Sequence, residues 1–111
     1  MDNRPWEFQA QPTGTIAVEH EAGGPVLYLR GDVDAPVVQQ WESEHSIDQK
    51  QIAAIDVSDM AYIDSIGLSF LVRWSQERSS AGQPAVIRKP RARFEQIMYI
   101  AGIGSLFVYE D

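Results

Sequence analysis

Apolar residues recur with a period of two in the early part of the chain. Ile16 and Val18 follow this spacing in residues 15–21, and Leu27 and Leu29 follow it in residues 26–33. Residues 23–25, Gly-Gly-Pro, lie between the two runs and are typical of a turn. The pattern predicts a β-hairpin whose second strand is buried on one face and partly covered on the other.

The spacing changes to that of a helix after residue 33. Asp34 is a suitable N-cap, and Pro36 falls within the first turn that would follow it. Val37, Val38 and Trp41 then recur at helical intervals. These positions predict a helix of about two to three turns.

Two apolar segments follow, and they have different lengths. Residues 52–58 have the length of a strand and indicate a central strand covered on both faces. Residues 66–82 are longer and predict a helix that ends at Gly82, because Pro84 prevents its continuation. The apolar positions of this helix form two faces, Leu68, Leu71, Val72 and Ser75 on one and Phe70 and Trp74 on the other.

The last part of the chain repeats the order of strand and helix. Residues 84–89 predict a strand, and residues 91–102 predict a helix in which Phe94, Ile97, Met98 and Ala101 share a face. Residues 105–109 predict a final short strand. The resulting order, ββαβαβαβ, implies mostly parallel pairing, because parallel neighbours require long crossover connections.

The predicted fold class is therefore α/β, with one domain in residues 14–111 and an N-terminal arm in residues 1–13. The domain is expected to contain a mixed, mostly parallel sheet of about five strands covered by three or more helices. Because its 111 residues are about the length of one domain, a single core is expected.

Charge and composition narrow the classes of partner. The formal net charge is −7, which disfavours direct binding to nucleic acid and to anionic membranes. The chain contains no cysteine and no apolar run long enough for a membrane helix, which needs about 18 to 20 residues. We therefore expect a cytoplasmic protein that binds other proteins, without insertion into a membrane.

Candidate catalytic and metal-binding residues are sparse. His20 and His45 are the only histidines, and each is predicted to be a solvated surface residue rather than a catalytic base. The aspartates do not have the spacing of a calcium loop, and no phosphate-binding glycine loop occurs. The sequence therefore predicts no enzyme activity, no metal site and no cofactor.

A basic segment interrupts the acidic chain at residues 88–93, Arg-Lys-Pro-Arg-Ala-Arg. It contains four of the nine basic residues. A solvated connection between strand and helix, a contact for an acidic protein or a phosphate group, and a nucleic-acid contact are all compatible with this segment.

Asp64 and Ser65 lie where the predicted central strand meets the long helix. Backbone N–H groups are unpaired at a helix N-terminus, and its dipole favours negative charge, so a phosphate on Ser65 would be accommodated there. A plain N-cap formed by Asp64 or Ser65 explains the same residues, with Gly67 permitting close backbone approach.

Residues 29–34, Leu-Arg-Gly-Asp-Val-Asp, and residues 54–68, which end in Asp-Ser-Ile-Gly-Leu, have a specific order along the chain. Together with the closing helix and strand, they resemble the STAS-domain family, and more narrowly the bacterial anti-sigma factor antagonists. The resemblance extends from about residue 15 to residue 110.

The resemblance implies a switch between protein partners. The unphosphorylated antagonist would bind an anti-sigma factor that is also a serine protein kinase, and would thereby release a sigma factor for transcription. The kinase would phosphorylate Ser65, a phosphatase would reactivate the protein, and the oligomeric state is left open. The resemblance places the partner interface around this serine, at Asp34, Tyr62, Asp64, Ile66, Gly67 and Leu68.

A second function within the same family is a soluble STAS subunit of a bacterial lipid-transport ATPase complex. There, the helix that begins near Ser65 would dock on an ATPase subunit without phosphorylation. Ile66 departs from the family pattern, in which a small residue is frequent at this position, and the segment 34–52 is short. Both departures bear on the choice of partner.

Overall fold

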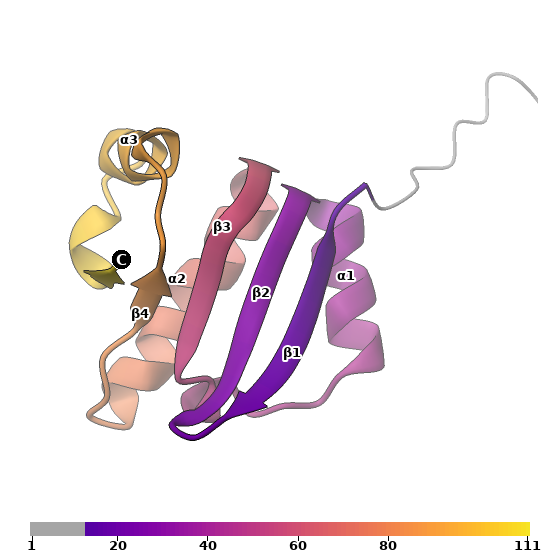
Figure 1. Cartoon of the computed structure of the whole chain (residues 1–111), viewed down its shortest axis with the longest axis vertical. Helices are drawn as coiled ribbons and strands as arrows, with labels where there is room; N and C mark the ends of the chain where they lie inside the picture. Colours follow the sequence, from indigo (N-terminus) through magenta and orange to yellow (C-terminus); the bar gives the residue numbers. More distant parts are fainter. Residues whose placement is uncertain (1–12) are drawn as a thin grey trace, which may run out of the picture.

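The structure, a computed structural model, describes residues 13–111 (Figure 1). The expected N-terminal arm, apart from Thr13, lies outside the described residues. The elements are β1 (Thr15–Glu21), β2 (Gly24–Val33), α1 (Ala35–Glu44), the 3-10 helix η1 (Gln49–Gln51), β3 (Ala54–Ile63), α2 (Ser65–Ser80), β4 (Val86–Arg88), α3 (Ala92–Ile100), the 3-10 helix η2 (Gly104–Leu106) and β5 (Val108–Glu110).

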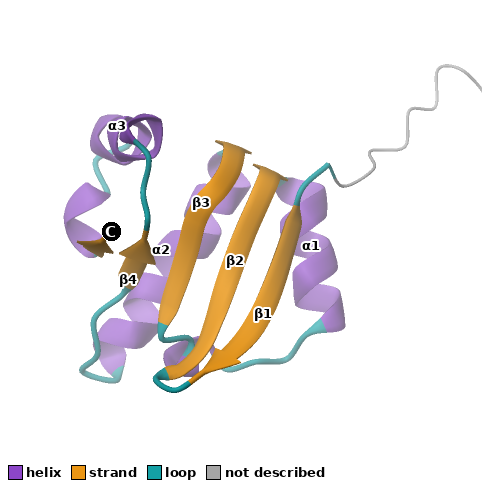
Figure 2. Ribbon diagram, in the orientation of Figure 1, coloured by secondary structure: helices purple, strands orange, loops and turns teal. Residues whose placement is uncertain are grey.

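The strands form one mixed sheet in the order β1-β2-β3-β4-β5 (Figure 2). β1 and β2 form the predicted antiparallel hairpin, and every later pair is parallel. The predicted order of strands and helices is confirmed, as is the predicted mostly parallel sheet. The crossover helices explain this topology, because each returns the chain to the same end of the sheet.

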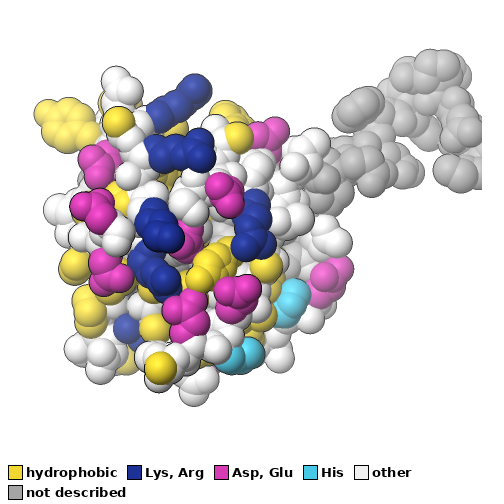
Figure 3. All heavy atoms as spheres, in the orientation of Figure 1, with side chains coloured by type: hydrophobic (Ala, Val, Ile, Leu, Met, Phe, Trp, Pro, Cys, Tyr) yellow, Lys and Arg dark blue, Asp and Glu magenta, His cyan; other side chains and the backbone are white. Residues whose placement is uncertain are grey.

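The predicted burial of the central strand on both faces is confirmed, because residues 54–57 of β3 are all buried, although within residues 13–111 the long helices α1 and α2 both lie on one face of the sheet. In Figures 1 and 2, α1 and α2 lie behind the sheet. Figure 3 shows the opposite face, on which basic and acidic side chains gather. On this open face Asp56 is only 5% exposed, because Tyr28 on β2 and Arg88 on β4 lie beside it.

The core lies between the sheet and the two helices behind it, and Phe94 and Met98 of α3 extend it. α1 contributes Val37, Val38 and Trp41, in agreement with the predicted helix. In α2, Phe70, Leu71 and Trp74 are buried, whereas Leu68 and Val72 are only half-buried. The Trp74 Nε1–H donates to the carbonyl oxygen of Ile52 at 3.0 Å, which satisfies its polar edge inside the core. The buried stripe of α2 therefore takes Phe70 and Trp74 from one predicted face and Leu71 and Ser75 from the other.

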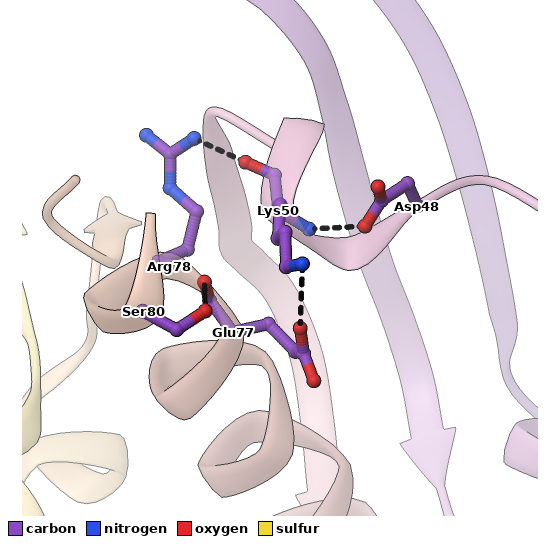
Figure 4. Close-up of polar contacts among 5 residues, drawn as sticks. All are labelled: Asp48, Lys50, Glu77, Arg78 and Ser80. Carbon is purple, nitrogen blue, oxygen red and sulfur yellow. Dashed lines mark hydrogen bonds and ion pairs between the residues drawn. The ribbon is translucent and has the colours of Figure 1, made fainter. Parts of the chain in front are cut away.

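A buried arginine, Arg78, joins the last part of α2 to η1, as Figure 4 shows, and to the loop before β4. The Arg78 guanidinium donates to the carbonyl oxygens of Lys50 at 2.7 Å and Pro84 at 2.9 Å. Burial lowers the pKa of Arg78. The other contacts drawn in this region lie nearer the surface. The Lys50 ammonium is 3.9 Å from the Glu77 carboxylate, and Asp48 accepts a hydrogen bond from the Lys50 N–H. Arg78 thus links the last part of α2 to η1 and to the segment that precedes β4.

Candidate functional site

Asp64 caps α2 at the end of β3. Its Oδ1 accepts a hydrogen bond from the Gly67 N–H at 2.9 Å. Its Oδ2 accepts a second bond from the N–H of Ala35, the first residue of α1, at 3.1 Å. One carboxylate therefore joins the N-termini of two helices, where both dipoles favour its negative charge.

Asp34 occupies the equivalent place at the end of β2. Its Oδ1 accepts from the Val37 N–H at 3.4 Å, which confirms Asp34 as the N-cap of α1. β2 and β3 are parallel neighbours, with Val33 opposite Ile63, and the Asp64 N–H donates to the Val33 carbonyl at 3.3 Å. This register brings the two aspartates to one end of the sheet, as the family resemblance implied.

Ser65 is the first residue of α2, and its side chain is exposed. Because Asp64 supplies the capping oxygen, the N-cap role that the sequence left open between these residues belongs to Asp64. The Ser65 hydroxyl is therefore free of the capping bond. It lies at the helix end whose N–H groups favour an anion.

Gly67 permits close packing between α2 and the two central strands. A Cβ at this position would lie 2.5 Å from Ile63 Cγ1 and 2.6 Å from the Val33 carbonyl oxygen. Gly67 is buried, so it positions the helix and offers no side chain to a partner. The requirement for glycine here comes from the approach of helix to sheet and not from an unusual φ angle.

The other predicted interface residues differ in exposure. Tyr62 is 49% exposed and Ile66 is 42% exposed, which is high for large apolar side chains beside a helix start. Leu68 is half-buried and packs against the core. Tyr62, Ser65 and Ile66 thus form an exposed surface, which we call the Ser65 surface, whereas Asp34, Asp64 and Gly67 support it from beneath.

The sequence did not predict a groove beside this surface. It has a volume of about 280 Å³ and lies between the later half of β3 and α3. Its lining residues are Val57, Met60, Ala61, Tyr62, Ile63, Arg91, Arg93, Phe94 and Ile97. The basic segment 88–93 indicated in the sequence that positive charge gathers here. Its position beside β3 was not predictable, because it depends on the direction in which the chain leaves β4.

A polar cluster occupies the open face of the sheet. The Tyr28 hydroxyl donates to Glu21 Oε2 at 2.6 Å, and Arg88 Nη1 lies 3.2 Å from Glu21 Oε1. The bond from Tyr28, together with Arg88, lowers the pKa of Glu21, and the bond to Glu21 raises the pKa of Tyr28. This contact joins β1 to β4 across the sheet.

The histidines offer no catalytic arrangement. His20 is exposed, as predicted, whereas His45 is half-buried and stacks on Trp41 with ring centroids 3.7 Å apart, so it is less solvated than a typical surface residue. In residues 13–111, no three histidine, aspartate or glutamate side chains are grouped to hold a metal ion. Nor does a helix within this range have the length and apolar character needed to cross a membrane.

These elements define a small α/β domain that presents a serine at the start of a helix beside the two central strands. Residues 16–109 match a family model described as "Mlab, STAS domain". The chain therefore belongs to the STAS-domain family, and the predicted resemblance to that family is confirmed. No curated protein sequence matches the chain.

Solved structures share this fold at low sequence identity. A Thermotoga maritima protein assigned as an anti-sigma factor antagonist is 16% identical, with a TM-score of 0.67 over 86% of each chain. The anti-sigma factor antagonist SpoIIAA in its unphosphorylated form is 17% identical, with a TM-score of 0.61 over 77% of this chain and 82% of SpoIIAA. Phosphorylated SpoIIAA of Bacillus is also 17% identical, with a TM-score of 0.63 over 85% of this chain and 89% of SpoIIAA.

Proposed function

We propose that this protein is an anti-sigma factor antagonist whose binding is controlled by phosphorylation of Ser65. The unphosphorylated protein binds an anti-sigma factor that is also a serine protein kinase, and a sigma factor is released for transcription. The observation that carries the proposal is the exposed hydroxyl of Ser65 at the first position of α2, beside a cap that Asp64 already supplies. The shared fold of SpoIIAA supports it.

The kinase supplies the chemistry, and this chain supplies the acceptor. The Ser65 oxygen attacks the γ-phosphorus of ATP, an O–P bond forms, and the bond to the β-γ bridging oxygen breaks. ADP leaves, and the hydroxyl proton passes to a base of the kinase. A phosphatase returns the hydroxyl by hydrolysis, so the antagonist itself needs no cofactor and catalyses no step.

Phosphorylation would change the surface more than the fold. The phosphate adds about −1.5 to −2 charges at pH 7 beside Asp64 and Asp34. The α2 N-terminus stabilises such a charge by about 0.3 to 1 kcal/mol, which partly offsets the repulsion. A partner surface that fits a neutral hydroxyl beside Tyr62 and Ile66 would instead meet a dianion. The complex would therefore dissociate in the cytoplasm without refolding of the antagonist.

The acceptor is tested by incubation with candidate anti-sigma kinases and ATP, followed by mass mapping. Phosphate should appear on Ser65 and be lost in Ser65→Ala, while Ser69→Ala, an exposed change one turn later in α2, should still be phosphorylated. Phosphate on Ser65→Ala at the wild-type level would refute the assignment.

The switch is tested by binding to the same kinase without ATP. Ser65→Glu should weaken the complex about 30- to 1,000-fold, which corresponds to about 2 to 4 kcal/mol, with little change in thermal unfolding. Ile66→Ala and Tyr62→Ala should each weaken it by about 1 to 2 kcal/mol if these exposed side chains are interface anchors. Unchanged affinity in all three variants would place the interface elsewhere.

The family model favours a second candidate, because its description names Mlab and not an anti-sigma factor antagonist. In this alternative the protein is the STAS subunit of a bacterial lipid-transport ATPase complex, and the Ser65 surface docks on the ATPase. Ser65→Ala would then retain full function, and the protein would co-purify with an ATPase rather than with a kinase of sigma regulation.

A further inference from the structure

The edge of β3 that faces β4 is only partly paired. β2 accompanies β3 along its whole length, as far as the pair Val33 and Ile63. β4 pairs with β3 only from Ala54 to Asp56. Within the described part of the chain, residues 57–63 therefore have no strand partner on this side. Such an edge presents backbone N–H and C=O groups that can pair with another chain.

The turn after β4 creates this free edge. Lys89 has a φ of +54°, in the left-handed region, and its N–H donates to the Glu110 carbonyl at 2.6 Å. Pro90 follows and cannot donate a ladder hydrogen bond. The connection from β4 to α3 consequently diverges from β3, as Figure 1 shows. A left-handed conformation is unfavourable for a residue with a side chain, so the surrounding structure must hold Lys89 in this turn.

The groove lies along this free edge. Met60, Phe94 and Ile97 provide its apolar floor, and Tyr62, Arg91 and Arg93 also line it. Met60 and Phe94 are buried, and Ile97 is half-buried. An apolar side chain placed here would contact the floor, while polar groups beside it would remain near the arginines.

The charge along the groove is opposite to that of the whole protein. Arg91 and Arg93 are both exposed, in a chain with a net charge of −7. Arg91 lies 4.0 Å from Asp59, and both side chains are about two-thirds exposed, at 65% and 68%. An exposed pair of this kind contributes little, so the guanidinium remains available to another carboxylate.

We propose that the groove binds an extended acidic segment of a partner protein, which adds as a strand to the free edge of β3. Backbone hydrogen bonds would supply affinity, and alternate side chains would supply specificity. Apolar residues on one face of the segment contact Met60, Phe94 and Ile97, and its carboxylates bind Arg91 and Arg93. Residues 57–63 are seven positions, long enough to pair with a strand of the usual length of about 5 to 6 residues. The proposal does not depend on phosphorylation of Ser65.

The probe is a short blocked peptide in which Glu or Asp alternates with Val, titrated into the uniformly ¹⁵N-labelled full chain. Amide resonances of residues 57–63 and 91–97 should shift, and the affinity should fall as salt is raised. A matched peptide with Lys in place of Glu and Asp should bind at least tenfold more weakly. Absence of shifts at millimolar acidic peptide, or shifts confined to other residues, would overturn the proposal.

Two further comparisons separate strand addition from general attraction between charges. The double variant Arg91→Gln and Arg93→Gln should bind the acidic peptide at least tenfold more weakly, with its amide spectrum otherwise dispersed as in the wild type. Arg73→Gln is the control, because Arg73 is exposed on α2 and pairs with Glu42 at 3.3 Å.

An acidic peptide N-methylated at alternate residues should also lose affinity, and equal binding of this peptide would refute strand addition.

Discussion

The carboxylate of Asp64 bonds both to Gly67 of its own helix and to Ala35 of the neighbouring one, at 2.9 and 3.1 Å. Helix caps are usually local, satisfying N–H groups within one helix. Here one side chain fixes the relative position of the starts of α1 and α2. The Ser65 surface is consequently held in place by a side chain that joins α1 to α2, and not by one loop alone.

Asp64→Ala should lower the free energy of unfolding by about 1 to 3 kcal/mol, because two N–H groups lose their acceptor. Asp64→Asn keeps one acceptor oxygen and should fall between this variant and the wild type. Urea denaturation measures both. Asp59→Ala is the matched control, since Asp59 is exposed and its side chain makes one long contact, with Arg91, among residues 13–111. Equal stability of Asp64→Ala and Asp59→Ala would contradict the bridging role.

Gly67→Ala should destabilise the protein by about 1 to 3 kcal/mol through overpacking against Ile63 and Val33. Alanine has the higher helix propensity, by about 1 kcal/mol, so propensity alone predicts the opposite sign. Thermal and urea unfolding decide between them. Ser69→Ala, at an exposed position of the same helix, should be neutral or slightly stabilising. A stabilised Gly67→Ala would show that the helix can move away from the sheet.

Local patterns predicted the elements better than their ends and faces. The alternation of Leu27 and Leu29 and the cap at Asp34 each depend on neighbours along the chain, and both features were correctly interpreted. β3, however, continues to Ile63, beyond the apolar run that predicted it, because β2 continues to pair with it. The local pattern predicted the burial of the central strand but not its cause at Asp56, where neighbouring residues on β2 and β4 provide the cover.

Only the part of the candidate site that lies in one continuous motif, around Ser65, could be predicted from the sequence. Ser65 was singled out from its place between a strand and a helix, and the structure places it at the first turn. The bond from Ala35 to Asp64 joins residues distant in sequence, so no local spacing could indicate it. The same limit applies to the groove, in which β3 and α3 meet only because the chain turns at Lys89.

Arg78→Met should lower the free energy of unfolding by about 2 to 4 kcal/mol. The change removes two charge-assisted hydrogen bonds, to Lys50 and Pro84, and leaves their carbonyl oxygens without these donors. Arg78→Lys should recover only part of the loss, because an ammonium lacks the guanidinium fork that reaches both carbonyl oxygens. Urea denaturation measures both, and Arg73→Met at an exposed position should change stability by less than about 0.5 kcal/mol. Equal values at the two positions would refute the role of Arg78.

Tyr28→Phe should raise the pKa of Glu21 toward its ordinary value of 4.5, because the strongest bond that lowers it is lost while Arg88 remains. A carboxyl whose pKa is lowered in the folded state stabilises the protein above the unfolded value, and this stabilisation disappears as pH falls through the folded pKa. The wild type should therefore lose more stability than Tyr28→Phe between neutral pH and a pH below both values. At the alkaline end, the raised pKa of Tyr28 stabilises the folded protein, and this stabilisation is lost as pH rises above 10 through the folded pKa. Only the wild type should show this alkaline loss of stability, because Tyr28→Phe has no hydroxyl to titrate.

Carboxyl ¹³C titration of Glu21 measures its pKa, and urea denaturation at each pH measures the stability. An unchanged Glu21 titration in Tyr28→Phe would contradict the bond.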